Sequence, residues 1–208
     1  MKQRHIYLTW TRILPCILVL SLSLNIHAQS ARSILDKTAT VVGRPSGASA
    51  NFTISSSKIG STSGTIAIKG NKFHARTPQA MVWFDGKTQW SYLKKTNEVN
   101  ISTPSQAQQM AMNPYTFITM YRSGYNLTNK SIGRNYQIRM VAQNKQASIQ
   151  EMYILINKSN YCPVQVKMKQ DNTWSTINIS NFKAKNLPNS IFVFLSKDLP
   201  SAEIIDLR

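Results

Sequence analysis

The chain has 208 residues, with 25 Lys and Arg against eight Asp and Glu, and a formal net charge of +17. A hydrophobic fraction of 42%, with eight Gly and eight Pro, excludes a disordered or collagen-like chain, and the length allows one domain with a substantial core. Two cysteines exclude a disulfide-stapled scaffold.

Residues 1–28 have the features of a secretory signal peptide. Lys2, Arg4 and Arg12 precede an apolar run at 13–26, and cleavage is predicted near Ala28–Gln29. The run is interrupted by proline and polar residues and is shorter than the roughly 20 residues of a membrane span. We therefore expect an exported protein, with an uncleaved membrane anchor as the alternative.

Cleavage would leave a strongly basic mature chain. It removes three of the 25 basic residues and no acidic one, leaving 22 against eight, or +14. The cations are spread along the chain, and no run is longer than Lys94-Lys95. This spread and the export signal argue against a nucleic-acid partner, and they favour either a solvated basic surface or attraction to an anionic membrane or acidic partner.

The first element expected after the cleavage point is a helix. Ile34, Leu35 and Val42 recur at helical spacing between Ser30 and Gly43, and Pro45 follows as a stop signal. From about residue 48 the period changes to two, which predicts strands. Ala50, Phe52 and Ile54 begin this pattern, and turns are predicted at Gly60, Gly64 and Gly70.

Asp85-Gly86 predicts a two-residue hairpin turn that pairs Phe84 with Lys87. This register places four large side chains on one face of the hairpin, Met81, Trp83, Trp90 and Tyr92, and leaves mostly smaller or polar ones on the other.

The segment at 104–124 loses the period of two. Its apolar residues are expected in two short helical stretches divided at Asn113-Pro114. The segment is too apolar for a surface loop, so we expect it to cover the mouth of the sheet as a lid or plug.

Strand patterns resume afterwards. Residues 152–156 are apolar at every position, which predicts a strand covered on both sides. A further strand is predicted near the C-terminus, at 191–194. The chain shows about 10 or 11 strands and neither linker nor repeat, so we expect one mainly β domain at 29–208 whose sheet curls around its apolar face.

Large aromatic and methionine side chains are the candidate ligand-binding residues. They suit an apolar cavity that adapts to a flexible guest, although a filled core is the alternative. The candidates are Phe52, Phe73, Met81, Trp83, Trp90, Tyr92, Met110, Met112, Phe117, Ile118, Met120 and Tyr121.

Five motifs, in this order and spacing, resemble those of LolA, the family of periplasmic carriers of outer-membrane lipoproteins. They are Ala50–Thr53, Lys69–Phe73, Phe84–Tyr92, Asn113–Tyr115 and Ile205–Arg208.

The resemblance implies a single-domain, unclosed antiparallel β-barrel covered by short helices as a lid. Its apolar interior would receive lipoprotein acyl chains through the candidate residues. The carrier would collect its cargo from an ATP-driven inner-membrane lipoprotein exporter and pass it to an outer-membrane acceptor. The resemblance also implies a monomer without cofactors or catalytic residues.

Two positions depart from the family pattern. Gly70 stands where the family has an Arg that holds the empty lid shut, and Ala75 stands where it usually has a Trp. The matching Phe73 is present. The way in which the lid is held is therefore open.

An enzyme is not expected, because the mature chain offers only His74, on the strand face opposite Phe73, and no set of metal ligands. Two other classes stay open. One is an exported carrier or sensor of another lipid or apolar ligand on a similar scaffold, and the other is a structural or protein-binding β domain.

Overall fold

The computed structural model describes residues 29–58, 60–105, 108–109 and 114–208. None of the helices in these ranges has the length and apolar character that a membrane crossing requires. Met110 and Met112, two of the candidate residues, lie outside the described residues.

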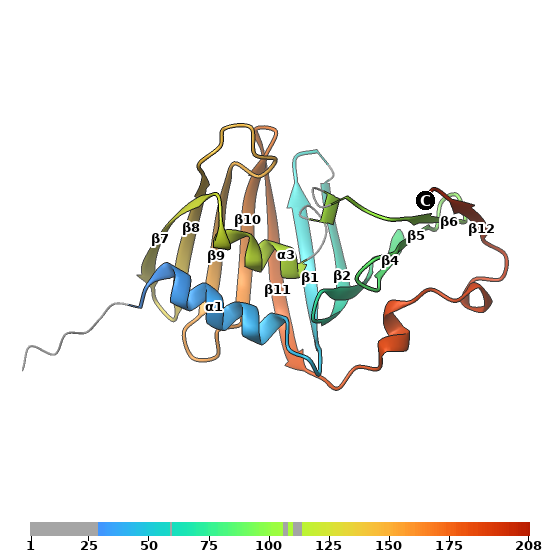
Figure 1. Ribbon diagram of the computed structural model, residues 1–208, viewed down its shortest axis with the longest axis horizontal. Coiled ribbons are helices and arrows are strands. Elements are labelled where there is room, and N and C mark those ends of the chain that lie inside the picture. Colours follow the sequence, from blue (N-terminus) through green and yellow to red (C-terminus); the bar gives the residue numbers. More distant parts are fainter. Residues whose placement is uncertain (1–28, 59, 106–107, 110–113) are drawn as a thin grey trace, which may run out of the picture.

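Within the described ranges, twelve strands form one open sheet in the order β12-β6-β5-β4-β3-β2-β1-β11-β10-β9-β8-β7 (Figure 1). All neighbours are antiparallel except β12 and β6. The expected unclosed, mainly β fold is confirmed. The strands are β1 (Ala48–Ser56), β2 (Gly60–Lys69), β3 (Lys72–Arg76), β4 (Ala80–Phe84), β5 (Gln89–Leu93), β6 (Glu98–Ser102), β7 (Tyr125–Ile132), β8 (Asn135–Ala142), β9 (Glu151–Asn157), β10 (Pro163–Gln170), β11 (Thr173–Ala184) and β12 (Glu203–Asp206).

Helix α1 (Ala31–Val42) confirms the predicted helix and its ends. The Ser33 N–H donates to Ser30 Oγ (3.1 Å) and caps the start, and the Gly43 N–H donates to the Ala39 carbonyl (2.8 Å) at the end. Its buried stripe includes Ile34 and Leu35, which are fully buried.

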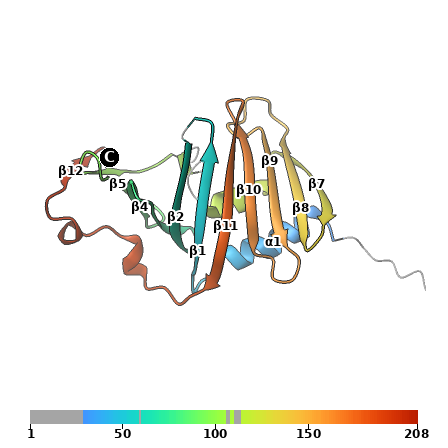
Figure 2. The same ribbon diagram turned by 180° about the vertical axis from the view of Figure 1, so that it is seen from behind.

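A helix layer covers one face of the sheet over β7–β11. It consists of α1, α3 (Pro114–Thr119) and the 3₁₀ turn η1 (Met120–Arg122), and it lies in front of these strands in Figure 1 and behind them in Figure 2. We call the covered face the inner face and the opposite one the outer face. The sequence-predicted lid therefore exists as α3 and η1 in the described part of the 104–124 segment.

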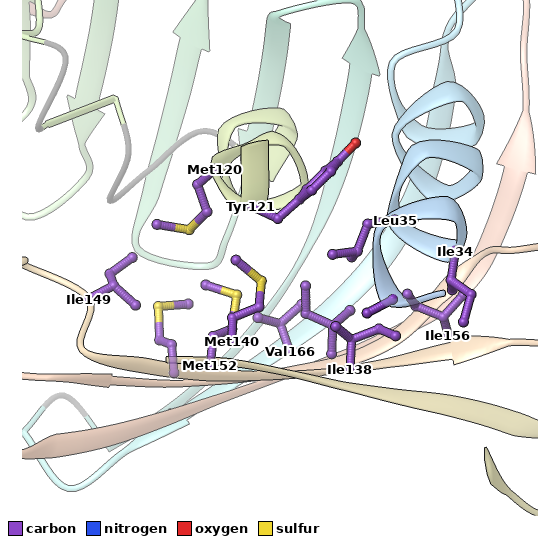
Figure 3. Close-up of a cluster of buried hydrophobic side chains, with 13 residues drawn as sticks. Ile34, Leu35, Met120, Tyr121, Ile138, Met140, Ile149, Met152, Ile156 and Val166 are labelled. Carbon is purple, nitrogen blue, oxygen red and sulfur yellow. The ribbon is translucent and has the colours of Figure 1, made fainter. Parts of the chain in front are cut away.

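Beneath the helix layer lies a filled apolar core (Figure 3). Each fully buried Ile or Met there contributes about 1.5–3 kcal/mol. Its main members are Ile34, Leu35, Met120, Tyr121, Ile138, Met140, Ile149, Met152, Ile154, Ile156, Val166 and Met168.

Strand β9 differs from its prediction. Met152, Ile154 and Ile156 are fully buried on the inner face, whereas Tyr153 and Leu155 are only half-buried on the outer face. The expectation of cover on both sides is therefore wrong, because the helix layer covers the inner face alone.

The β4–β5 hairpin has a four-residue loop and not the predicted two-residue turn. Asp85 Oδ1 accepts the backbone N–H groups of Lys87 (2.9 Å) and Thr88 (2.7 Å), so the loop extends to Thr88 and Phe84 pairs with Gln89. The register moves by two residues. Since side chains alternate with period two, the predicted division of the hairpin into two faces still holds.

The C-terminal segment, residues 187–202, crosses the outer face beside β3 and β4 and includes η2 (Asn189–Phe192) and η3 (Ser196–Asp198) (Figure 2). Lys69 Nζ donates to the Leu187 carbonyl (2.7 Å), and Asn97 Nδ2 donates to the Ser201 carbonyl (2.6 Å). The prediction of a strand at 191–194 is therefore wrong. This segment lies on the face of the sheet, where the strands already pair with one another and offer it no backbone partner.

The turn predicted at Gly64 is wrong, because Gly64 lies inside strand β2. It pairs with Phe52 of β1, whose ring occupies the space that a side chain at 64 would need. A Cβ there would lie 2.1 Å from the Arg76 carbonyl oxygen and 2.6 Å from Phe52 Cζ.

We predict that Gly64→Ala lowers the free energy of unfolding by about 3 kcal/mol, because the backbone oxygen of Arg76 cannot move away without breaking the β2–β3 pairing. Urea denaturation measures this loss. Ser61→Ala, at an exposed position of the same strand, is the control and should change stability by less than about 0.5 kcal/mol. Equal denaturation midpoints for both variants would contradict the packing of Phe52 over Gly64.

Candidate functional site

An apolar cavity of about 410 Å³ lies beside the filled core, where the inner face of β1–β4 curves away from the helix layer. Val42 of α1 and Ile118 of α3 line it from the helix side. The sheet supplies the rest of its lining, Ala50, Asn51, Phe52, Ile54, Ile66, Ile68, Phe73, Ala75, Thr77, Val82, Pro163, Val166, Met168, Gln170, Ser175, Ile177, Ile179 and Phe182.

A small residue stands in the wall of this cavity. Ala75 on β3 pairs with Ile66 on β2 and with Val82 on β4, and all three line the cavity. A methyl group between these larger neighbours leaves space that a large side chain would fill. The departure at Ala75 noted in the sequence therefore enlarges the cavity.

Phe73, in the cavity wall, packs against Phe84 on the same face of the sheet. They pair across β3 and β4 with ring centroids 5.6 Å apart and planes tilted by 35°, and both are buried in one cluster with Val42 and Ile118. Tilted aromatic pairs contribute about 0.5–1.5 kcal/mol beyond burial, so this wall is rigid.

The lid is held to α1 by a buried tyrosine. The Tyr121 hydroxyl of η1 donates to Asp36 Oδ1 of α1, and the Arg32 guanidinium lies 5.7 Å from the centre of the Tyr121 ring. Burial, and after it the hydrogen bond to Asp36, raises the pKa of Tyr121 above its ordinary value. Gly70, at the family's latch position, sits in the β2–β3 turn with φ +58°.

Three of the candidate residues line the cavity, namely Phe52, Phe73 and Ile118. Met120 and Tyr121 belong instead to the filled core next to it. Phe117 lies on α3, and its side chain is outside the described part of the structure.

The other four candidates, Met81, Trp83, Trp90 and Tyr92, are on the outer face. The pairing of β3 with β4 sets Phe73 opposite Phe84 and His74 opposite Trp83, so Trp83 shares a face with His74 and not with Phe73. The expectation that these four share the inner face with Phe73 is wrong. His74 lies opposite to Phe73, as expected, but it is buried under the C-terminal segment.

Sequence reasoning also left out the cavity wall that β10 and β11 provide. Val166, Met168, Ile177 and Ile179 line it. Their alternation was recognised as a strand signal, but nothing local in the sequence indicates that β11 pairs with β1 and so brings this wall next to Phe52.

The described residues offer no group of three His, Cys, Asp or Glu side chains placed to hold a metal ion. The arrangement on the inner face is suited to enclosing an apolar ligand, since few polar atoms line it.

Comparison with known proteins agrees with this architecture. The chain matches the family model described as outer membrane lipoprotein carrier protein LolA over residues 22–172. No curated protein matches the sequence.

Among solved structures, an uncharacterized conserved protein from Thermus thermophilus is similar at 14% identity and a TM-score of 0.58, over 85% of this chain and 98% of that chain. A LolA superfamily protein from Nitrosomonas europaea has 14% identity and a TM-score of 0.44, over 79% of this chain and 98% of its own. A putative outer membrane lipoprotein-sorting protein domain from Vibrio parahaemolyticus has 10% identity and a TM-score of 0.45, over 78% and 95%. The first of these likenesses supports the fold.

We predict that Tyr121→Phe loosens the lid, because the buried ring loses its hydrogen bond to the Asp36 carboxylate. The free energy of unfolding should fall by about 1–3 kcal/mol, and amide hydrogen exchange should accelerate at 114–122. Tyr125→Phe is the control, since Tyr125 donates to the Ile149 carbonyl (2.9 Å) and does not contact α1 through that bond. Unchanged exchange at 114–122 in Tyr121→Phe would show that this bond does not hold the lid.

Proposed function

Because the chain belongs to the LolA family of outer membrane lipoprotein carrier proteins, we propose that it is a periplasmic carrier that binds lipoprotein acyl chains. The inner cavity is the proposed site. The carrier would take lipoproteins from an ATP-driven exporter in the inner membrane and deliver them to an acceptor at the outer membrane. It would act as a binding protein and not as an enzyme.

The observation that carries this proposal is the apolar lining of the 410 Å³ cavity. Its volume is in the range of about 300–1,000 Å³ that ligand pockets occupy. An acyl chain exposed to water costs about 0.8 kcal/mol per CH₂, so a carrier must enclose many methylene groups. Such enclosure needs a mainly apolar wall, and most of the residues that line the inner cavity are apolar.

Release of the cargo requires a wall that deforms. Met168 lines the cavity, and the methionines Met120, Met140 and Met152 lie in the adjacent core. Their unbranched side chains repack at low cost. A cargo with several acyl chains needs more space than the cavity holds, so we propose that α3 and η1 move away from the sheet when it binds.

A second candidate function is carriage or sensing of another lipid in the same cavity. An apolar wall discriminates poorly between acyl chains that are attached to different head groups. Mass spectrometry of lipids that copurify with the protein, together with lipoprotein localisation after depletion, separates the two functions.

We predict that Ala75→Phe blocks the cavity and lowers the affinity for lipoprotein acyl chains by about tenfold or more. If the new ring displaces two methylene groups of the acyl chain from the cavity, the binding free energy already weakens by about 1.6 kcal/mol. The measurement is release of a labelled lipoprotein from inner-membrane vesicles into the soluble fraction. The protein should remain folded, as judged by circular dichroism, since the added ring enters existing space.

Ala67→Phe is the matched control. Ala67 lies on the outer face of the neighbouring strand, opposite His74, so a ring there leaves the inner cavity open. Lipoprotein release should be unchanged in this variant. Unimpaired release by a folded Ala75→Phe protein would refute the inner cavity as the cargo site.

A further inference from the structure

A second and larger cavity, the outer groove, lies on the opposite side of the sheet. It measures about 900 Å³ and runs between the outer face of β1–β4 and the C-terminal segment. The sheet separates it from the inner cavity. Its lining comprises Ser49, Ala50, Asn51, Thr65, Ile66, Ala67, His74, Arg76, Met81, Trp83, Asn181, Lys185, Ser190, Ile191, Val193, Leu195, Lys197, Asp198 and Leu199.

Specific contacts position the walls of the outer groove. His74 Nδ1 forms a hydrogen bond with the Ile191 carbonyl oxygen (2.7 Å). Because a carbonyl oxygen can only accept a hydrogen bond, Nδ1 is the donor and carries the proton. His74 Nε2 then accepts from Arg76 Nε (3.0 Å), and the ring is neutral. Burial is the main cause that lowers the pKa of His74. Trp83 packs on Phe194 with ring centroids 5.4 Å apart.

Positive charge in the outer groove is not neutralised by the protein. Arg76, Lys185 and Lys197 line it, and Asp198 is the acidic residue among its lining residues. In the described part of the chain, ion pairs form at Arg139–Glu151 and Arg208–Asp206, and none involves these three cations. Arg76 donates to His74 through Nε, so this bond does not engage its two terminal nitrogens, each of which carries N–H donors.

The remaining wall of the groove is apolar. Met81 and Trp83 contribute from β4, and Ile191, Val193 and Leu195 from the C-terminal segment. Leu195 is 43% exposed, so part of the apolar wall of the groove is open to solvent. An apolar surface next to uncompensated positive charge matches a molecule with a hydrocarbon chain and an anionic head.

We propose that the outer groove is a second binding site, which takes a single-chain anionic amphiphile such as a long-chain fatty acid. Arg76, Lys185 and Lys197 attract the head group, and the chain lies along Met81, Trp83 and Leu195. An acidic peptide fits less well. Strands β1–β4 are each paired on both sides, so the floor offers no free edge for strand addition.

The test is calorimetric titration of the full mature chain with oleate, in the Ala75→Phe background that closes the inner cavity. One oleate should still bind. Adding Ala67→Phe, which fills the floor of the groove opposite His74, should weaken that binding by about tenfold or more. Methyl oleate, which has the chain without the charge, should bind at least about fivefold more weakly.

A second pair of variants avoids the packed sheet altogether. Leu195 is exposed, so Leu195→Glu should fold normally and weaken oleate about five- to tenfold by charge repulsion, whereas Leu195→Gln should have a smaller effect. Raising the salt concentration should reduce the difference between these two variants.

Several outcomes would overturn the proposal. They are loss of all oleate binding in Ala75→Phe alone, unchanged affinity in both Ala67→Phe and Leu195→Glu, or equal binding of methyl oleate. Displacement of bound oleate by a poly-glutamate peptide of higher affinity would reassign the groove to an acidic peptide. Lipoprotein release by Ala75→Phe is measured separately, so failure of the outer groove and failure of the inner cavity remain distinguishable.

Discussion

The pairing of β3 with β4 is the constraint on which both cavities depend. It sets Phe73 opposite Phe84 and His74 opposite Trp83. Because neighbouring residues point to opposite faces, one register assigns the phenylalanines to the inner face and the histidine and tryptophan to the outer groove. A slip by one residue would place Phe73 opposite Trp83 or His74 opposite Phe84, so each face would mix the two sets.

The two halves of the sheet serve different purposes. Over β7–β9 the helix layer and the strands fill their shared space, with Ile138, Met140 and Ile154 fully buried, whereas β10 and β11 also line the cavity. Over β1–β4 the inner face lines the cavity, with the small residue Ala75 in its wall. A solid half therefore holds the helices, while the hollow half provides space for a ligand.

Local signals in the sequence were enough to predict most of the elements and much less of the site. The spacing from Ile34 to Val42 defined α1, and alternation defined the strands and the two faces of the β4–β5 hairpin. The hairpin register was missed because the Asp85 carboxylate caps two N–H groups and lengthens the loop.

The pairing of β3 with β4 decides that Trp83 lies on the same face as His74. The burial of His74 depends on the C-terminal segment, which is more than 100 residues away in the sequence. Neither is encoded in local periodicity.

The four buried methionines of the sheet and lid have a chemical consequence beyond packing. Met140 and Met152 have no exposed surface, so conversion of either thioether to a sulfoxide would place a polar oxygen inside a buried, mainly apolar cluster. The methionine-rich packing beneath the helices thus makes the stability of this core sensitive to oxidants, and it is the burial of these sulfur atoms under α1, α3 and η1 that limits the access of an oxidant to them.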